Sequence, residues 1–290
     1  MVQNIILNKS NIVENSNNSK FEYKFPTTQH FKDMQIALGN LSYNNSIFNI
    51  TTDYNNNFFQ YQWYGAGAIP VSNVTIPNGI YTLEELNAYL QYVMLNNGHY
   101  LVDSNGDYVW YLALTVNRTA YGYEITSDPI PTALPLGWTN PAGMTFPAVA
   151  TTPQIILPAT NIRTLLGFPA GTYPPAVQAT TFNIKSPNIP IIHPVYNVLI
   201  ACSLVANDLQ YPNQVMYSYQ NLRNVAGGLP VSIVPPEYAF IDLQDGYYHS
   251  LTIQLLDQDF NPIAVYDPNI LFNLLLCKRC TIPFKSSLMM

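Results

Sequence analysis

Apolar and polar residues alternate along much of the last part of the chain. Leu251, Ile253 and Leu255 are separated by single polar residues, which is the two-residue period of a strand with one buried face. An Asp- and Asn-rich segment at 257–262 predicts a turn. The run at 269–276 is apolar on both sides of a pleat, so we expect a central strand that is covered on both faces.

Short strands are expected through the rest of the chain as well. They are separated by clusters of Asn, Gly and Pro, which favour turns. The expected strands are 34–38, 58–64, 71–76, 109–115, 180–184, 195–204, 214–219, 231–234, 238–242 and 263–266. No period of 20 to 50 residues recurs, so the chain is not a repeat array.

Helical spacing occurs in two places. Thr82 and Glu85 form a capping box before a run of leucines at helical spacing that ends near Asn97. A shorter helix is expected at 161–166, where Gly167 follows the last helical residue. Between them, residues 128–158 carry many prolines and little periodicity, which predicts a long excursion between strands.

These patterns predict an all-β chain. The expected fold is a single jelly-roll β-sandwich of antiparallel strands, with long Pro-rich loops and one or two short helices in insertions. We expect a flexible N-terminal arm at 1–25, which could order only against a neighbour. A jelly-roll domain at 26–280 follows, with a loop-rich insertion around 77–175, and then a C-terminal tail at 281–290.

The low content of charged residues indicates that the protein assembles with other subunits. Charged residues make up 10% of the chain, against about 25% in a typical soluble protein. A surface so poor in charge is poorly suited to a free monomer, and we infer that other subunits cover much of it. The net charge of -6 with 11 Lys and Arg argues against nucleic-acid binding. The apolar runs are too short to predict membrane insertion.

The sequence offers no convincing catalytic or metal-binding constellation. His30, His99, His193 and His249 lie far apart and outside metal-ligand spacings, and His193 and His249 are expected to be structural. Cys202, Cys277 and Cys280 include one Cys-x-x-Cys pair, but a closed zinc site needs a fourth ligand. An odd number of cysteines and the lack of a signal peptide favour a reducing compartment. We predict no catalytic residue, no cofactor and no metal.

The acidic clusters have structural explanations. The spacing at 103–107 invites a calcium loop, but Asn105-Gly106 is typical of a hairpin turn. The Asp257 and Asp259 pair falls in the expected turn, and Glu84 with Glu85 falls in a first helical turn, where acids suit the dipole. We therefore expect no paired-carboxylate active site.

Three stretches carry a family resemblance. They are 75–86, with Pro77-x-Gly79-x-Tyr81 before the helix; 165–173, with Leu-Leu-Gly-Phe followed by Gly-Thr-Tyr; and 251–276. Together they resemble the penton proteins, the vertex or minor capsid proteins, of virophages and Polinton-like double-stranded DNA viruses, within the group that includes the adenovirus penton base. Unlike the adenovirus form, this chain is short and has no Arg-Gly-Asp motif.

The resemblance implies a structural, non-enzymatic subunit. It implies a homopentamer that plugs the fivefold vertices of an icosahedral capsid and contacts neighbouring major capsid proteins. The protein would then reside in the virion after assembly in the host cytoplasm or nucleus. An alternative is a viral attachment or glycan-binding jelly-roll module, suggested by the many Tyr and Trp residues beside Asn and Asp in loops. A polysaccharide-cleaving jelly roll would need a carboxylate pair that the sequence does not nominate.

Overall fold

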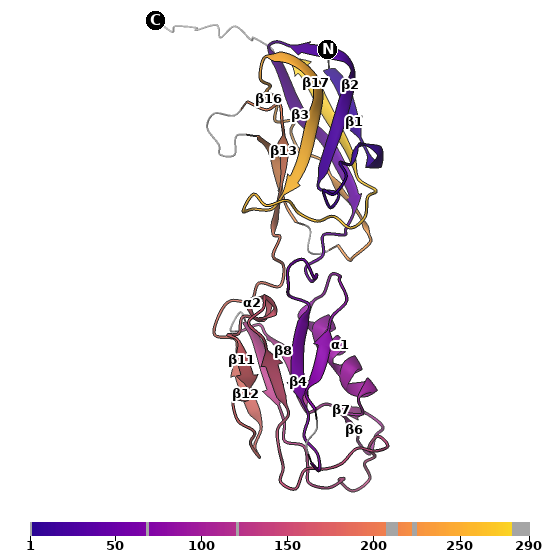
Figure 1. Ribbon diagram of the computed structural model, residues 1–290, viewed down its shortest axis with the longest axis vertical. Coiled ribbons are helices and arrows are strands. Elements are labelled where there is room, and N and C mark those ends of the chain that lie inside the picture. The colour runs from indigo at the N-terminus through magenta and orange to yellow at the C-terminus, as the bar shows by residue number, and fades with distance from the viewer. Residues whose placement is uncertain (1, 68–69, 120–121, 207–213, 222–224, 280–290) are drawn as a thin grey trace, which may run out of the picture. The chain divides into compact units, whose positions relative to one another are not determined.

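The chain folds into two compact units. The computed structural model describes residues 2–67, 70–119, 122–206, 214–221 and 225–279. Unit 1 comprises Met1–Phe48 and Val195–Met290, and unit 2 comprises Asn49–Pro194 (Figure 1). The chain is mostly β-strand in antiparallel sheets, as predicted, but one sandwich does not account for all of it, because each unit has a hydrophobic core of its own.

Unit 1 consists of two sheets. Sheet A has the order β1-β18-β3-β15, with β16 as a further partner of β3, and sheet B has the order β14-β13-β17-β2. The strands of sheet A are β1 (Val2–Leu7), β18 (Leu271–Lys278), β3 (Met34–Asn44), β15 (Pro230–Ile233) and β16 (Ile241–Asp242). Those of sheet B are β14 (Val215–Gln220), β13 (Asn197–Cys202), β17 (Gly246–Leu256) and β2 (Lys20–Phe31). A 3-10 turn, η1 (Lys9–Asn11), lies between β1 and β2.

The core of unit 1 lies between these sheets. Phe21 of β2 meets Phe272 of β18 edge to face, with ring centroids 5.0 Å apart, a favoured aromatic geometry. The Tyr219 hydroxyl of β14 donates to the Tyr43 hydroxyl of β3 at 3.3 Å. Burial raises the pKa of both tyrosines, so both remain neutral and the bond joins the sheets inside the core.

A bulge on β3 requires a glycine. Asn273 pairs with Asn40 while Leu274 pairs with Leu38, which leaves Gly39 as the extra residue. A Cβ on Gly39 would lie 3.0 Å from the Asn273 carbonyl oxygen and 3.2 Å from Leu275 Cγ. The absence of a side chain at Gly39 therefore lets β3 and β18 approach at the bulge.

Two expectations for unit 1 differ from the structure. Residues 1–25 are not a flexible arm, because β1 pairs with β18 along its length and Ile5 and Leu7 enter the core. Residues 263–266 form no strand, although Ile263 and Val265 are buried.

Unit 2 contains two larger sheets, a small hairpin and two helices. One sheet has the order β11-β10-β4-β5 and the other β12-β9-β8, while β6 pairs with β7. The strands are β4 (Phe58–Gln62), β5 (Ser72–Thr75), β6 (Leu101–Val102), β7 (Tyr108–Val109), β8 (Leu112–Asn117), β9 (Gly122–Ser127), β10 (Gln154–Leu157), β11 (Gly171–Tyr173) and β12 (Phe182–Lys185). The helices are α1 (Leu83–Asn96) and α2 (Ile162–Leu166).

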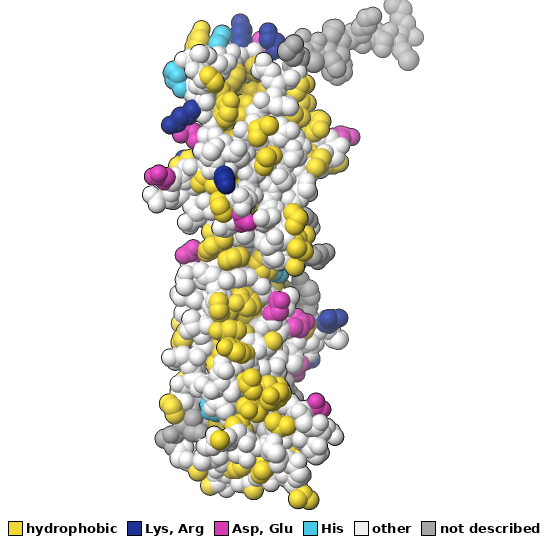
Figure 2. Space-filling view, turned by 90° about the vertical axis from the view of Figure 1, so that its right-hand side faces the viewer, with side chains coloured by type: hydrophobic (Ala, Val, Ile, Leu, Met, Phe, Trp, Pro, Cys, Tyr) yellow, Lys and Arg dark blue, Asp and Glu magenta, His cyan; other side chains and the backbone are white. Residues whose placement is uncertain are grey.

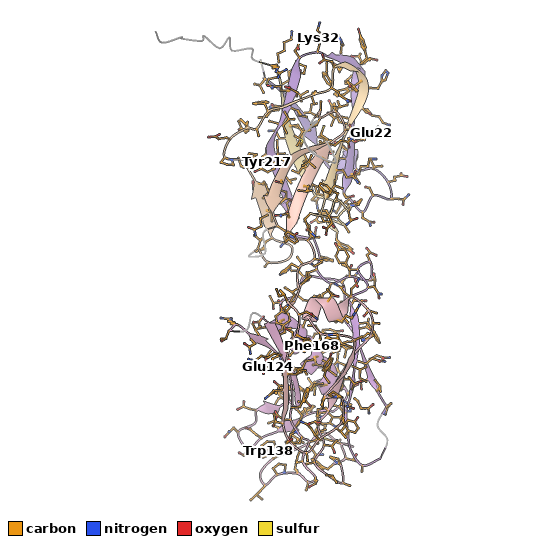
Figure 3. All side chains as sticks on the ribbon, turned by 90° about the vertical axis from the view of Figure 1, so that its left-hand side faces the viewer. Glu22, Lys32, Glu124, Trp138, Phe168 and Tyr217 are labelled. Carbon is orange, nitrogen blue, oxygen red and sulfur yellow. The ribbon has the colours of Figure 1, made fainter. Side chains whose placement is uncertain are left out.

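The two helices begin and end as the sequence predicts. Thr82 and Glu85 form the expected capping box of α1, with the Glu85 backbone N–H donating to Thr82 Oγ1 at 3.2 Å. Gly167 ends α2 in the left-handed region at φ 78°. Phe168 then enters the core of unit 2 (Figure 3). None of the described helices is long and apolar enough to cross a membrane.

The boundaries of unit 2 differ from those expected for an insertion. We expected a loop-rich insertion at 77–175, whereas the separate unit runs from 49 to 194. The additional residues include β4, β5 and β12, which supply side chains such as Phe59 and Val74 to its core. The Pro-rich stretch 128–158 is mostly irregular until β10 begins, as predicted. The expected tail at 281–290 lies outside the described residues.

Candidate assembly surface

Strand β18 is apolar on both sides but is covered on only one. Phe272, Leu274 and Leu276 point into the core of unit 1 and are buried. The alternate residues face away from it, and Leu271 is 37% exposed while Leu275 and Cys277 are half-buried. The prediction of a central strand is confirmed, because β18 lies between β1 and β3. Within the described residues, its second face lacks the full cover expected from the sequence.

Strands β1, β3 and β15 extend this exposed side into a continuous surface. Val2 lies opposite Cys277 and Ile6 lies opposite Asn273, and Val2 and Ile6 are 56% and 54% exposed. We call this surface the outer face of sheet A. Its outward-facing residues are Val2, Asn4, Ile6, Gln35, Ala37, Asn40, Ser42, Ser232, Leu271, Asn273, Leu275 and Cys277, of which Ala37 is buried.

Among the described residues, the charged groups of this face lie at its rims. At one end, Arg279 lies 3.1 Å from Asp242, and Gln35 Nε2 donates to the same carboxylate at 2.8 Å. At the other end, Asn44 Nδ2 donates to Asp267 Oδ2 at 2.6 Å, and this hydrogen bond helps to lower the pKa of Asp267. An uncharged centre with a polar rim is the usual anatomy of a protein interface.

One polar atom on the outer face of sheet A is unsatisfied. Asn273 Oδ1 is buried and has no hydrogen-bond partner among the described residues. An unsatisfied buried acceptor costs about 1–3 kcal/mol. The amide nitrogen of the same side chain lies 3.3 Å from the position that a Cβ on Gly39 would take, so the Asn273 amide lies at the bulge.

The outer face of sheet B is different. Lys20, Glu22 and Lys24 of β2 lie opposite Gln254, Thr252 and Ser250 of β17. Lys24 Nζ lies 3.7 Å from Glu22 Oε2, and the Lys24 side chain is 80% exposed. Glu22 is labelled on this strand in Figure 3. Charged residues on an exposed edge strand discourage pairing with another chain.

Charge is sparse elsewhere on the molecule as well. Figure 2 shows a face on which hydrophobic and uncharged side chains cover most of the surface, with only scattered charged groups. Large apolar side chains outside sheet A are also exposed, including Leu136, Ile189 and Tyr247. Single exposed apolar residues are ordinary in proteins, so the continuity of the outer face of sheet A is what distinguishes it.

The structure places the four histidines apart. His30 stacks on Tyr247 with centroids 4.4 Å apart, and His249 Nδ1 lies 3.1 Å from Thr28 Oγ1. His99 lies in unit 2, where it stacks on Trp63 and hydrogen bonds to Tyr61. His193 lies at the end of unit 2 and also has an interaction partner. The partners of His30, His99 and His249 are aromatic or hydroxyl groups.

The cysteines do not converge on a metal site in the part of the chain that is described. Cys202 is buried in unit 1, and burial raises the pKa of its thiol to about 11. Cys277 lies on the outer face of sheet A, and Cys280 lies outside the described residues. Among the described residues, no three His, Cys, Asp or Glu side chains stand close enough to hold a metal ion.

The acidic clusters form the turns that the sequence predicts. Asp103 Oδ1 accepts from the backbone N–H groups of Asn105 and Asp107 in the β6–β7 hairpin, and the bond from Asp107 contributes most to lowering its pKa. Asp257 Oδ1 likewise accepts from the N–H groups of Asp259 and Asn261. These carboxylates organise their own loops.

The residues that β1 contributes to the outer face of sheet A were not predicted from the sequence. The signal was present, because residues 2–7 are apolar on both sides, as residues 270–276 are. Val2 and Ile6 face outward while Ile5 and Leu7 face the core. The Asn- and Ser-rich residues that follow dominate the composition of 1–25, and this composition favoured an arm over a strand.

Comparison with solved structures finds similar chains, among them two from virophages. No protein-family description and no curated protein matches the chain. The crystal structure of the mavirus penton protein is similar over 96% of this chain and 98% of its own, with 10% identity and a TM-score of 0.43. A structure of the Sputnik virophage is similar over the same shares, with 10% identity and a TM-score of 0.41. At this identity and score, the likenesses carry no argument about function.

Proposed function

We propose that this chain is a structural capsid protein whose copies assemble into the pentameric vertex capsomers, or pentons, of an icosahedral virus. The outer face of sheet A carries the proposal, because among the described residues it is uncharged at its centre, with exposed apolar side chains, and carries charge at its rims. In this proposal the ring contacts neighbouring major capsid proteins in the virion. The chain acts without catalysis or a cofactor and does not bind nucleic acid.

The energetics of the outer face of sheet A favour a protein partner. Val2, Ile6 and Leu271 are partly exposed apolar side chains on neighbouring strands. Fully burying one aliphatic side chain of this size contributes about 1.5–3 kcal/mol relative to full exposure. Covering these three partly exposed side chains therefore contributes part of the free energy of association. In a closed ring, this face meets a different patch on the next subunit.

The strand order of unit 1 supports a jelly roll. Without the short strand β16, unit 1 has eight strands, which can be numbered from one to eight in chain order. Sheet A then has the order 1-8-3-6, and sheet B has the order 5-4-7-2. Eight strands in two packed Greek-key sheets form a jelly roll, an architecture found in viral capsid and lectin domains. We therefore interpret unit 1 as the jelly roll and unit 2 as an insertion between its third and fourth strands.

The jelly-roll interpretation does not decide the function, because one fold serves many functions. The three sequence stretches that resemble penton proteins favour the capsid role over the lectin role. Two of these stretches lie in unit 2 and one in unit 1, so the resemblance is not confined to the jelly roll.

Assembly of the purified chain tests the proposal. Mass photometry and negative-stain electron microscopy of the wild type are expected to show rings with fivefold symmetry. Ile6→Asp places a charge on strand β1 of the outer face of sheet A, where Ile6 is already 54% exposed, and is expected to abolish the rings while leaving a folded monomer.

Ser250→Asp is the matched control, because it adds the same charge to the outer face of sheet B opposite Lys24. It is expected to leave the rings intact. A wild type that stays monomeric at high concentration, also in capsid reconstitution, contradicts the capsid role. Normal rings from Ile6→Asp would preserve that role but assign the contact to another face.

A further inference from the structure

An apolar groove lies at one edge of unit 1. In the part of the chain that the structure describes, β1 is the last strand of sheet A and β2 is the last strand of sheet B (Figure 1). Residues of both strands line a hollow of about 420 Å³, which we call the edge groove. Its apolar lining residues are Ile5, Tyr23, Phe25, Pro26, Phe31 and Leu276. None of its lining residues is charged, so the groove suits an apolar occupant.

Three aromatic rings of β2 form a row in the edge groove. Tyr23 meets Phe25 edge to face with ring centroids 5.5 Å apart, and Phe25 meets Phe31 in the same way, also at 5.5 Å. Phe31 is buried, whereas Tyr23 and Phe25 are only partly buried although they pack against the core. Covering Tyr23 and Phe25 would remove further apolar surface from water, which favours binding of apolar side chains here.

The edge of β1 beside this groove is open to pairing. β1 pairs with β18 on one side, and among the described residues no strand pairs with its other side. Its sequence, Val-Gln-Asn-Ile-Ile-Leu, contains no charge and no proline, and its register with β18 has no bulge. Charged residues, proline and bulges are the features that protect sheet edges. The edge of β1 can therefore accept an added strand, whose main chain pairs with β1 while alternate side chains enter the groove.

The sequence of residues 281–290 matches such a groove. This segment lies outside the described residues. Its alternate positions 282, 284, 288 and 290 are Ile, Phe, Leu and Met, and its one charged residue, Lys285, falls between them. A two-residue period is typical of a strand with one buried face. If the apolar positions face the groove, Lys285 faces away from it, so no charge enters the uncharged lining.

The last described residue is held on the side of β18 away from β1. The Arg279 backbone N–H donates to the Asp33 carbonyl oxygen at 2.7 Å, and the Arg279 side chain lies 3.1 Å from the Asp242 carboxylate. Asp33 directly precedes β3, and Asp242 belongs to β16, which pairs with β3. Because β18 separates β3 from β1, the direction of Arg279 favours the groove of a neighbouring copy over that of its own chain. Residues 280–290, if extended, span about 36 Å, which exceeds the length of about 20 Å of a six-residue strand such as β1.

We propose that residues 281–290 of one copy bind along the edge of β1 in a neighbouring copy, as an added strand of sheet A. The side chains of Ile282 and Phe284 enter the edge groove and cover Tyr23 and Phe25. This inference deepens the proposed function and rests on the assembly of copies that it requires, because it names the segment by which one copy holds the next.

Binding of a labelled peptide to the full chain tests the site. The peptide has the sequence of residues 281–290, and the chain carries Phe284→Asp, which leaves the grooves of its copies free. Fluorescence anisotropy is expected to show that the wild-type peptide binds and that a Phe284→Asp peptide binds at least about tenfold more weakly, because a charge is costly in an uncharged groove.

The matched control is a Ser287→Asp peptide. It carries the same added charge at a position between the apolar ones, so it should bind as the wild-type peptide does. No binding of the wild-type peptide, or equal binding of the Phe284→Asp peptide, would overturn the proposal.

A change on the groove side locates the binding. Gln3 lines the edge groove and is exposed, so Gln3→Asp adds a charge there without burying it in the folded chain. This variant is expected to bind the wild-type peptide at least about tenfold more weakly. Ser250→Asp, which adds the same charge to the outer face of sheet B, should bind it normally. Unchanged peptide binding by Gln3→Asp contradicts the assignment to the edge groove.

Mixing two full-length variants shows whose groove is filled. Phe284→Asp has an intact groove and a defective segment, whereas Gln3→Asp has the reverse. By analytical ultracentrifugation, each variant alone is expected to be monomeric, and their mixture is expected to form pairs. A mixture that stays monomeric would overturn the assignment to a neighbouring copy, and so would normal assembly of either variant alone.

Failure of this proposal can be told apart from failure of the capsid proposal. If the wild type forms fivefold rings but the peptide does not bind, the capsid role stands and the contact at the edge groove is refuted. If the peptide binds and the two variants pair but the wild type forms no rings, the capsid proposal fails and the contact stands.

Discussion

The two outer faces of unit 1 differ although their inner faces are alike. Both sheets bury aliphatic residues, such as Leu274 on β18 and Leu255 on β17, in one shared core. Outward, sheet A presents apolar and amide groups with charges only at its rims. Sheet B presents Lys20, Glu22 and Lys24 along β2.

This difference indicates that the inner faces of the sheets determine folding and that the outer faces determine assembly. The inner faces need only apolar side chains of the right size, because the core excludes water from both sheets. The outer faces are free to differ, and charge on one of them maintains solubility while its absence on the other favours a partner. One sandwich can therefore fold as a unit and still offer one face for assembly.

The largest expected effect is a loss of folding stability, and it tests whether the inner faces of the two sheets are equally buried. Leu274→Asp in sheet A and Leu255→Asp in sheet B each bury an unpaired charge at positions that are 0% and 3% exposed. We expect a loss of more than about 4 kcal/mol of stability and no soluble protein from either variant, measured by soluble yield on expression. Leu274→Met, which nearly conserves volume, should remain soluble. Normal expression of both Asp variants would mean that the core is misplaced.

An intermediate effect is expected on the outer face of sheet A. Asn273→Leu removes the buried acceptor that lacks a partner among the described residues. We expect the isolated chain to gain about 1 kcal/mol in the free energy of unfolding, measured by urea denaturation of the monomer. The same variant should leave ring formation unchanged, because an acceptor with almost no accessible surface makes no contact with a partner chain.

Gln254→Leu on the outer face of sheet B is the comparison for Asn273→Leu. Gln254 is half-buried and lies opposite Lys20, so water can reach its amide. Its replacement should change stability by less than about 0.5 kcal/mol. Destabilisation of the monomer by Asn273→Leu would show that the amide is already satisfied within one chain.

The smallest effect is expected from the charges of sheet B. Glu22→Gln removes the partner of Lys24 at 3.7 Å, in a pair whose side chains are 35% and 80% exposed. Exposed pairs of this kind contribute about 0–1 kcal/mol, so the urea midpoint and the rings should hardly change. Altered ring formation in Glu22→Gln would make the outer face of sheet B a second interface and remove the contrast between the faces.

Much of the local structure was predictable because its causes are local. The capping box of Thr82 and Glu85 and the left-handed Gly167 depend on neighbours within one helical turn. The Asp103 and Asp257 turns likewise depend on carboxylates that bond to nearby backbone N–H groups. The stacking of Trp63 on His99 in unit 2 was not predictable, because the two rings come from distant segments.

The sequence by itself determined that strands at 251–256 and 270–276 have apolar inner faces, and that the second is apolar on both sides. It also determined a surface poor in charge, which implies partners. Only the tertiary structure decided that β17 and β18 lie in different sheets, that β1 pairs with β18, and that their outward residues join into one face. The physical reason is that a two-residue period says which side of a strand is buried, whereas the neighbouring strand is chosen by contacts between distant segments.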